Sequence, residues 1–124
     1  MTVLVDSDII IEVLRGRDRQ IVSQWSDLSM SDAAVLCSAV TIAEVWAGAR
    51  PAEHEALGDL FAGIICVPID SEAGREAGGY IRAYGKSHHV KLGDALIAAA
   101  AAANRAALWT RNRKHYPMKD LSFF

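Results

Sequence analysis

Short apolar runs alternate along the chain with longer amphipathic stretches. The first run, Val3-Leu4-Val5, ends in Asp6, and Ile9-Ile10-Ile11 begins a helical pattern just behind it. Brief apolar runs bounded by polar or turn residues are typical of buried strands, and their alternation with helices favours an α/β fold with a mostly parallel sheet. The pattern predicts strands at 2–5, 35–38, 64–67 and 107–109 with a weaker one at 121–123, and helices at 7–15, 20–28, 42–49, 53–61, 72–84 and 94–103.

Length and composition favour one compact domain over residues 1–124, since 52% of the 124 residues are hydrophobic. The 13 Lys and Arg against 15 Asp and Glu give a net charge of -2. A polyanionic ligand such as RNA would therefore have to meet local positive charge or a metal ion. No charged segment followed by an apolar stretch opens the chain, and no apolar run approaches the ~20 residues of a membrane span. We expect no membrane partner.

The two cysteines, Cys37 and Cys66, both fall in apolar, strand-like runs. This setting is typical of small buried side chains, whereas a disulfide or metal framework has its own spacing. A reducing, cytoplasmic location fits this usage of cysteine.

Three acids and one amide fall at the same predicted edge of the sheet. Parallel strands place all their C-terminal ends at one edge, where open α/β sheets bind ligands. We therefore expect these side chains to converge although they are far apart in sequence. They are Asp6 after the first strand, Glu44 in the helix after the second, Asp94 at the start of the alanine-rich helix, and Asn112 after the strand at 107–109.

Each of these acids also has a purely structural interpretation. Thr41 and Glu44 fit a capping box with Thr41 as the N-cap. Asp94 complements the positive end of its helix dipole, and Asp6 or Ser7 can cap the first helix. Their combination favours a functional site, because three carboxylates in one crevice repel one another unless a cation neutralises them.

Oxygen ligands without any zinc-like spacing of His or Cys predict a hard cation, Mg²⁺ or Mn²⁺, held by Asp6, Glu44 and Asp94. Such a cation polarises a phosphoryl oxygen and activates water, which suits hydrolysis of a phosphodiester bond. Nearby basic residues would hold the polyanion, although the same residues also fit a solvated surface. They are Arg15, Arg17, Arg19, Arg111, Arg113 and Lys114.

Four segments in order resemble the motifs of PIN-domain ribonucleases, and specifically the VapC-type toxins of bacterial toxin–antitoxin pairs. The resemblance extends over almost the whole chain, and four motifs at this spacing are far more specific than any one alone. The segments are 3–11 followed by Leu14-Arg15-Gly16, then 38–45 with Gly48, then 93–99, and finally 108–116.

This resemblance implies a three-layer α/β/α fold with a central, mostly parallel five-stranded sheet, and a Mg²⁺- or Mn²⁺-dependent endoribonuclease. It implies metal binding by Asp6 and Asp94, and a metal-ligand or water-positioning role for Glu44. Many members of the family have a fourth acid where this chain has Asn112. An amide can bind a metal or orient water but adds no charge, so the resemblance leaves open whether one or two ions bind.

The resemblance also implies partners: a cognate VapB-type antitoxin that inhibits the enzyme, and assembly as a homodimer or a toxin–antitoxin hetero-oligomer. Apolar residues of the first two helices could line the groove for the antitoxin, although the same residues fit a core. They are Ile10, Val13, Leu14, Val22 and Trp25.

Three other classes of protein remain as alternatives. The segment Asp6-Ser7-Asp8 resembles the nucleophile motif of haloacid-dehalogenase-like phosphatases, but Ile9 and Ala98 stand where that family expects a small or hydroxyl residue and an acid. A receiver domain needs an acceptor Asp at the end of its third strand, and Asp70 lies beyond the predicted strand. A PIN-like domain that binds RNA or a partner without catalysis is consistent with Asn112.

Overall fold

The computed structural model describes all residues 1–124, and every predicted strand and helix is present. Two short 3₁₀ helices, η1 (Pro51–Glu53) and η2 (Arg113–His115), were not predicted. The strands are β1 (Thr2–Val5), β2 (Ala34–Ser38), β3 (Ile65–Val67), β4 (Ala107–Trp109) and β5 (Ser122–Phe123), and the helices are α1 (Ser7–Arg15), α2 (Arg19–Ser29), α3 (Ala39–Gly48), α4 (His54–Ala62), α5 (Ser71–His88) and α6 (Leu92–Ala103).

The five strands form one sheet in the order β3-β2-β1-β4-β5, and every neighbouring pair is parallel. The predicted α/β class and the five-stranded sheet are therefore confirmed. β1 lies at the centre, where Val3 pairs with Val35 of β2 and Val5 with Trp109 of β4. Because all strands run the same way, the residues that follow β1 and β4 come out side by side at one edge.

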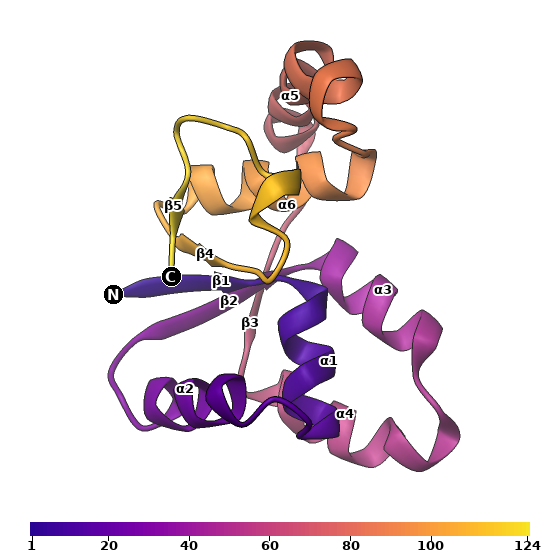
Figure 1. The fold of residues 1–124 in the computed structure, drawn as a ribbon, viewed down its shortest axis with the longest axis vertical. Helices are drawn as coiled ribbons and strands as arrows, with labels where there is room; N and C mark the ends of the chain where they lie inside the picture. The colour runs from indigo at the N-terminus through magenta and orange to yellow at the C-terminus, as the bar shows by residue number, and fades with distance from the viewer.

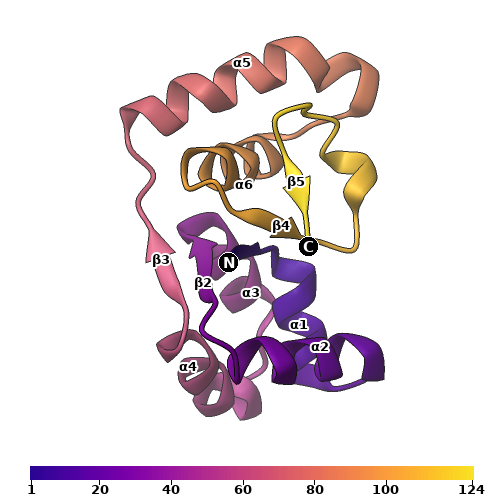
Figure 2. The same ribbon diagram turned by 90° about the vertical axis from the view of Figure 1, so that its left-hand side faces the viewer.

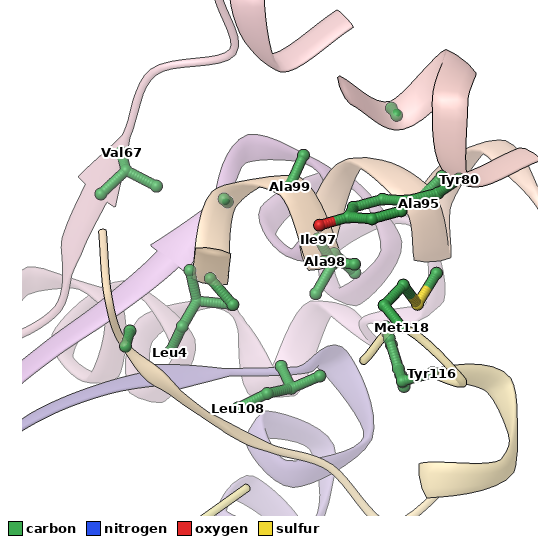
Figure 3. Close-up of a cluster of buried hydrophobic side chains, with 14 of the residues drawn as sticks. Leu4, Val67, Tyr80, Ala95, Ile97, Ala98, Ala99, Leu108, Tyr116 and Met118 are labelled. Carbon is green, nitrogen blue, oxygen red and sulfur yellow. The ribbon is translucent and has the colours of Figure 1, made fainter. Parts of the chain in front are cut away.

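Helices cover both faces of the sheet and give three layers. Figures 1 and 2 show α5 and α6 on one side of the strands and α1, α2 and α4 on the other. The side chains of β1 alternate accordingly. Leu4 belongs to the cluster beneath α6, together with Leu108 and a run of alanines (Figure 3), whereas Val3 and Val5 pack toward α1. Alanines let α6 approach the sheet closely, because their side chains add almost no thickness between the two layers.

Several predicted boundaries and caps differ from the structure. The helix expected at 42–49 begins at Ala39, because Ser38 is its N-cap and accepts a hydrogen bond from the backbone N–H of Val40. The prediction of Thr41 as the cap was therefore wrong, and Thr41 is fully buried inside α3. Helix α5 continues to His88, well past the expected end at residue 84.

The cysteines occupy paired positions of β2 and β3, with Cys37 opposite Cys66. Cys37 is buried as predicted, and burial raises the pKa of its thiol to about 12. Cys66 is exposed, so the prediction of burial was wrong there. β3 is an edge strand, and its Ile65 is exposed as well.

No helix has both the length and the apolar character needed to cross a membrane.

Candidate active site at the C-terminal edge of the sheet

Asp6 lies where β1 ends and α1 begins, and its carboxylate is almost fully hydrogen-bonded. Asp6 is the N-cap of α1, and its Oδ1 accepts from the backbone N–H of Ser7 at 2.7 Å. Its Oδ2 accepts from two hydroxyls, Thr110 Oγ1 at 2.8 Å and Tyr116 Oη at 3.0 Å. Asp6 is only 7% exposed, so donors of the protein itself satisfy most of its carboxylate.

The register of the sheet explains why Thr110 reaches Asp6. Val5 pairs with Trp109, and the backbone N–H of Asp6 donates to the carbonyl of Trp109 at 2.9 Å. The next residues along each strand, Asp6 and Thr110, are thus neighbours. In Figure 1, β1 and β4 point toward the side of the molecule where α1 and α3 begin.

Glu44 of α3 shares this edge with Asp6 and Asp94, as predicted. Partial burial raises the pKa of Glu44, a hydrogen bond with the Ser7 side chain lowers it, and the charges of Asp6 and Asp94 raise it further. The three carboxylates are therefore close enough to repel one another. A side chain at Gly93 would come within 3.8 Å of Glu44 Oε2, so the start of α6 lies against this carboxylate.

Asp94 lies in the first turn of α6, where its Oδ2 accepts a long hydrogen bond of 3.4 Å from the backbone N–H of Lys91. Asp94 thus occupies the position expected for an acid that complements the helix dipole, and its hydrogen bond to the backbone is weak. His115 Nδ1 is 3.9 Å from the same oxygen. Asp94 also contributes, after burial and Asp6, to raising the pKa of Tyr116. Asp94 therefore faces the same buried phenol as Asp6.

Asn112 lies beside Asp8, and its backbone N–H donates to Thr110 Oγ1 at 3.0 Å. Its Nδ2 donates to Asp8 Oδ2 at 3.2 Å, and the backbone N–H of Arg111 donates to the same oxygen at 3.0 Å. Burial and the Asp6 charge raise the pKa of Asp8 to about 6. The amide of Asn112 thus supports a carboxylate that a fourth acid would repel.

Most of the predicted RNA-contacting cations are already paired. A buried carboxylate, Glu12, accepts a hydrogen bond from Arg17 at 2.9 Å and forms an ion pair with Arg111 at 3.1 Å. Arg15 pairs with Glu53 at 3.5 Å. Arg113 lies 4.9 Å from the Phe123 ring centroid and donates to the carbonyl of Phe124 at 3.2 Å. The two without such partners are Arg19 and Lys114.

The structure contains no ready-made group of three His, Cys, Asp or Glu side chains spaced for a metal ion. The donor set nevertheless fits a hard cation, because Asp6, Glu44 and Asp94 offer only oxygen and repel one another. A bound cation would neutralise their negative charge. None of the three lines the two main cavities, which lie between α5 and α6 and between α2 and α4.

Sequence reasoning missed the roles of Thr110, Tyr116 and Glu12. A signal for Thr110 was available, because it follows β4 just as Asp6 follows β1. Tyr116 follows the unpredicted turn η2, and no periodicity marks such a turn. Glu12 is a charged residue in a predicted amphipathic helix, where exposure to solvent is the usual expectation. In the folded chain it is only 6% exposed.

Residues 3–121 match the PIN domain family model. The chain therefore belongs to the PIN-domain family. Among characterised proteins, it is 37% identical over 121 residues to the ribonuclease VapC10 of Mycobacterium tuberculosis, a match that covers 94% of this chain and 86% of the relative. The predicted family is thus confirmed, and the phosphatase and receiver-domain alternatives are excluded.

Solved structures agree with this assignment. A toxin–antitoxin complex from Klebsiella pneumoniae contains a chain that is 25% identical, with a TM-score of 0.73 over 96% of this chain and 94% of that one. VapBC2 from Rickettsia felis, bound to a promoter DNA fragment, superposes with a TM-score of 0.83 over 100% of this chain and 98% of that one. The latter is 17% identical and supports the fold alone.

Proposed function

We propose that this protein is a divalent-metal-dependent endoribonuclease, the toxin of a VapC-type toxin–antitoxin pair. One observation carries the proposal: Asp6, Glu44 and Asp94 come from three different elements to one edge, and the charges of the other two raise the pKa of Glu44. A purely structural cap has no reason to accumulate such repulsion. A site that binds a cation has such a reason, because attraction to the bound cation outweighs the repulsion among the carboxylates.

Mg²⁺ or Mn²⁺ bound by Asp6 and Asp94 would polarise the scissile phosphate and lower the pKa of an attacking water. Thr110 and Ser7 orient Asp6 through hydrogen bonds to its two oxygens. Glu44 is the most exposed of the three acids and has the raised pKa, so it is suited to ligate the cation or to accept a proton from water. The cytoplasm supplies both the cation and the substrate.

RNA is the proposed substrate because a characterised relative is named as a ribonuclease. Lys114, in η2, is exposed and makes no ion pair, and it follows Asn112 by two residues. Its charge is therefore available for a phosphate near the acids. Arg19, at the start of α2, is a second free cation at a greater distance along the chain.

The proposed partner is a VapB-type antitoxin, since solved relatives are toxin–antitoxin complexes. A cavity of about 320 Å³ between α2 and α4 is lined by Trp25, Leu28 and Leu60 and suits an apolar segment of such a partner. Trp25, one of the apolar residues suggested for the groove, lines this cavity. Ile10 does not, because it is fully buried in the core. Assembly as a homodimer or a hetero-oligomer remains part of the proposal.

The decisive experiment is cleavage of structured RNA by the purified chain, freed of any antitoxin. We expect cleavage with Mg²⁺ or Mn²⁺, loss of cleavage with EDTA, and a fall of more than about 100-fold in Asp94→Asn, since even residues that only support metal ligands cost 10- to 100-fold. Asp120→Asn, an acid outside the site, should cleave normally. Cleavage that persists in EDTA would refute the metal requirement, and a folded but inactive wild type would favour the non-catalytic alternative.

A further inference from the structure

We propose that Tyr116 is a positioning residue that restricts Asp6 to binding a divalent cation through one oxygen, and so favours Mg²⁺ over larger ions such as Ca²⁺. The inference rests on the proposed metal site and goes beyond it, because it assigns the choice of metal to a side chain that does not itself bind the ion.

The lone pairs of Asp6 limit how this carboxylate can bind a cation. Each carboxylate oxygen accepts about two hydrogen bonds in the plane of the group. The hydroxyls of Thr110 and Tyr116, at 2.8 and 3.0 Å, use both positions on Oδ2. The backbone N–H of Ser7 uses one position on Oδ1 at 2.7 Å. The Ser7 hydroxyl makes only a long contact of 3.4 Å to Oδ1, so the second position on this oxygen is the one that a cation can take.

Tyr116 is held too firmly to release its hydrogen bond without cost. It is 3% exposed and belongs to the larger core cluster, where Met118 and Leu108 are also members (Figure 3). Its backbone N–H donates to the carbonyl of Arg113 at 2.9 Å, which fixes the turn η2 in front of it. The phenol therefore approaches Oδ2 from the core, and the cation has to come from the other side.

Mg²⁺ and Ca²⁺ differ in the coordination geometry that they require from a carboxylate. Mg²⁺ requires near-octahedral geometry at 2.0–2.1 Å, keeps several waters, and is bound through one or two carboxylates. Ca²⁺ takes six to eight oxygens at 2.3–2.6 Å and readily uses both oxygens of one carboxylate. Because hydrogen bonds occupy both positions on Oδ2, Asp6 can bind Mg²⁺ through one oxygen but cannot bind Ca²⁺ through both.

Tyr116→Phe tests the inference, because it keeps the ring in the core and frees one position on Oδ2. The chain offers a matched control in Tyr80→Phe. Tyr80 is also buried, and its hydroxyl donates to another acid, Asp120, at 2.7 Å. Both variants lose one phenolic hydroxyl from a tyrosine–aspartate hydrogen bond, but only one of the two aspartates belongs to the metal site.

The measurement is isothermal titration of each folded protein with Mg²⁺ and with Ca²⁺, without RNA. We expect the ratio of Mg²⁺ to Ca²⁺ affinity to fall about tenfold or more in Tyr116→Phe, the scale seen for residues that support metal ligands. The ratio should stay unchanged in Tyr80→Phe. Thr110→Val removes the other donor to Oδ2 and should shift the ratio in the same direction, which provides a second route if Tyr116→Phe does not fold.

An unchanged ratio in both Tyr116→Phe and Thr110→Val would overturn the inference while leaving the proposed nuclease intact. An equal shift in Tyr80→Phe would also overturn it, since the effect would then not depend on Asp6. If the wild-type chain binds neither ion, the metal site of the proposed function fails, and the inference fails with it.

Discussion

Two tyrosine–aspartate hydrogen bonds of similar length lie in two acidic regions of this protein and differ in almost every other respect. Tyr116 donates to Asp6 at 3.0 Å, and Tyr80 donates to Asp120 at 2.7 Å. The carboxylate of Asp6 is buried at the end of the central strand, whereas Asp120 is exposed beside a cavity of about 450 Å³ between α5 and α6.

The acids around the two pairs differ in the same way. Asp70, Glu72 and Glu76 line the cavity near Asp120, and Asp70 is explained as the N-cap of α5, with its Oδ1 accepting from Ala73. At the sheet edge, the acids come from separate elements, and burial together with neighbouring charges raises the pKa of Asp8 and of Glu44. Acidity alone therefore does not identify a site. Convergence of buried or mutually repelling carboxylates at strand ends does.

The largest expected effect comes from removing the central acid. Asp6→Ala should abolish RNA cleavage and lower the free energy of unfolding by about 2 kcal/mol, because a helix cap is lost and two buried hydroxyls lose their acceptor. Asp120→Ala should cleave normally and lose less than about 1 kcal/mol, since water replaces its partner. Activity assays and urea unfolding of both variants check this. Equal losses would show that the two regions are equivalent.

A smaller effect is expected from adding the fourth acid that this chain lacks. Asn112→Asp places a carboxylate where the amide now donates to Asp8 at 3.2 Å. Repulsion at this distance should reduce stability at pH 7 by about 1 kcal/mol in solvent-exposed surroundings. Addition of Mn²⁺ should recover part of that loss, as judged by urea unfolding. Asn112→Ala, which only loses the hydrogen bond, is the control and should be less affected.

The pH dependence of stability should distinguish Asp8 from an ordinary surface acid. Its pKa of about 6 in the folded chain lies above the ordinary value of 3.8 for an aspartate. Between these values the folded chain keeps a proton that the unfolded chain has released, so stability falls as pH rises and the whole penalty is present above pH 6. Relative to the wild type, Asp8→Asn should gain in melting temperature on going from pH 3.5 to pH 7. A constant difference would contradict the raised pKa.

The smallest expected effect is that of Tyr80→Phe. Loss of its hydrogen bond to an exposed carboxylate should reduce stability by about 1 kcal/mol or less and leave cleavage unchanged. Urea unfolding and the RNA assay test both statements. A large loss of activity would mean that the region between α5 and α6 communicates with the acids at the sheet edge.

The strands, the helices and the convergence of the three acids could be predicted from sequence, because apolar periodicity and parallel topology are local or simple properties. Asp6, Glu44 and Asp94 were found in this way. What could not be predicted depended on contacts across the fold. The hydrogen bond from the Asn112 amide to Asp8, for example, follows only from the path of the chain after β4.

Tyr116 shows the same limit more sharply. It reaches Asp6 across 110 positions of sequence, after a 3₁₀ turn that no apolar pattern marks. The burial of Glu12 could not be predicted either, because its partners Arg17 and Arg111 approach it only in the folded chain. The ligands of a site lie where topology places them, whereas the side chains that orient those ligands depend on individual loops.

The most direct test of the central claim is the effect of Mg²⁺ on the melting temperature of the wild type, Asp94→Asn and Asp120→Asn, measured without RNA. Binding to the folded state alone stabilises it, by about 2.7 kcal/mol when the ion is at 100 times its dissociation constant. The account predicts a rise in melting temperature for the wild type and for Asp120→Asn, and little or none for Asp94→Asn. An equal rise in all three proteins, or a rise lost only in Asp120→Asn, would contradict a metal site at the sheet edge.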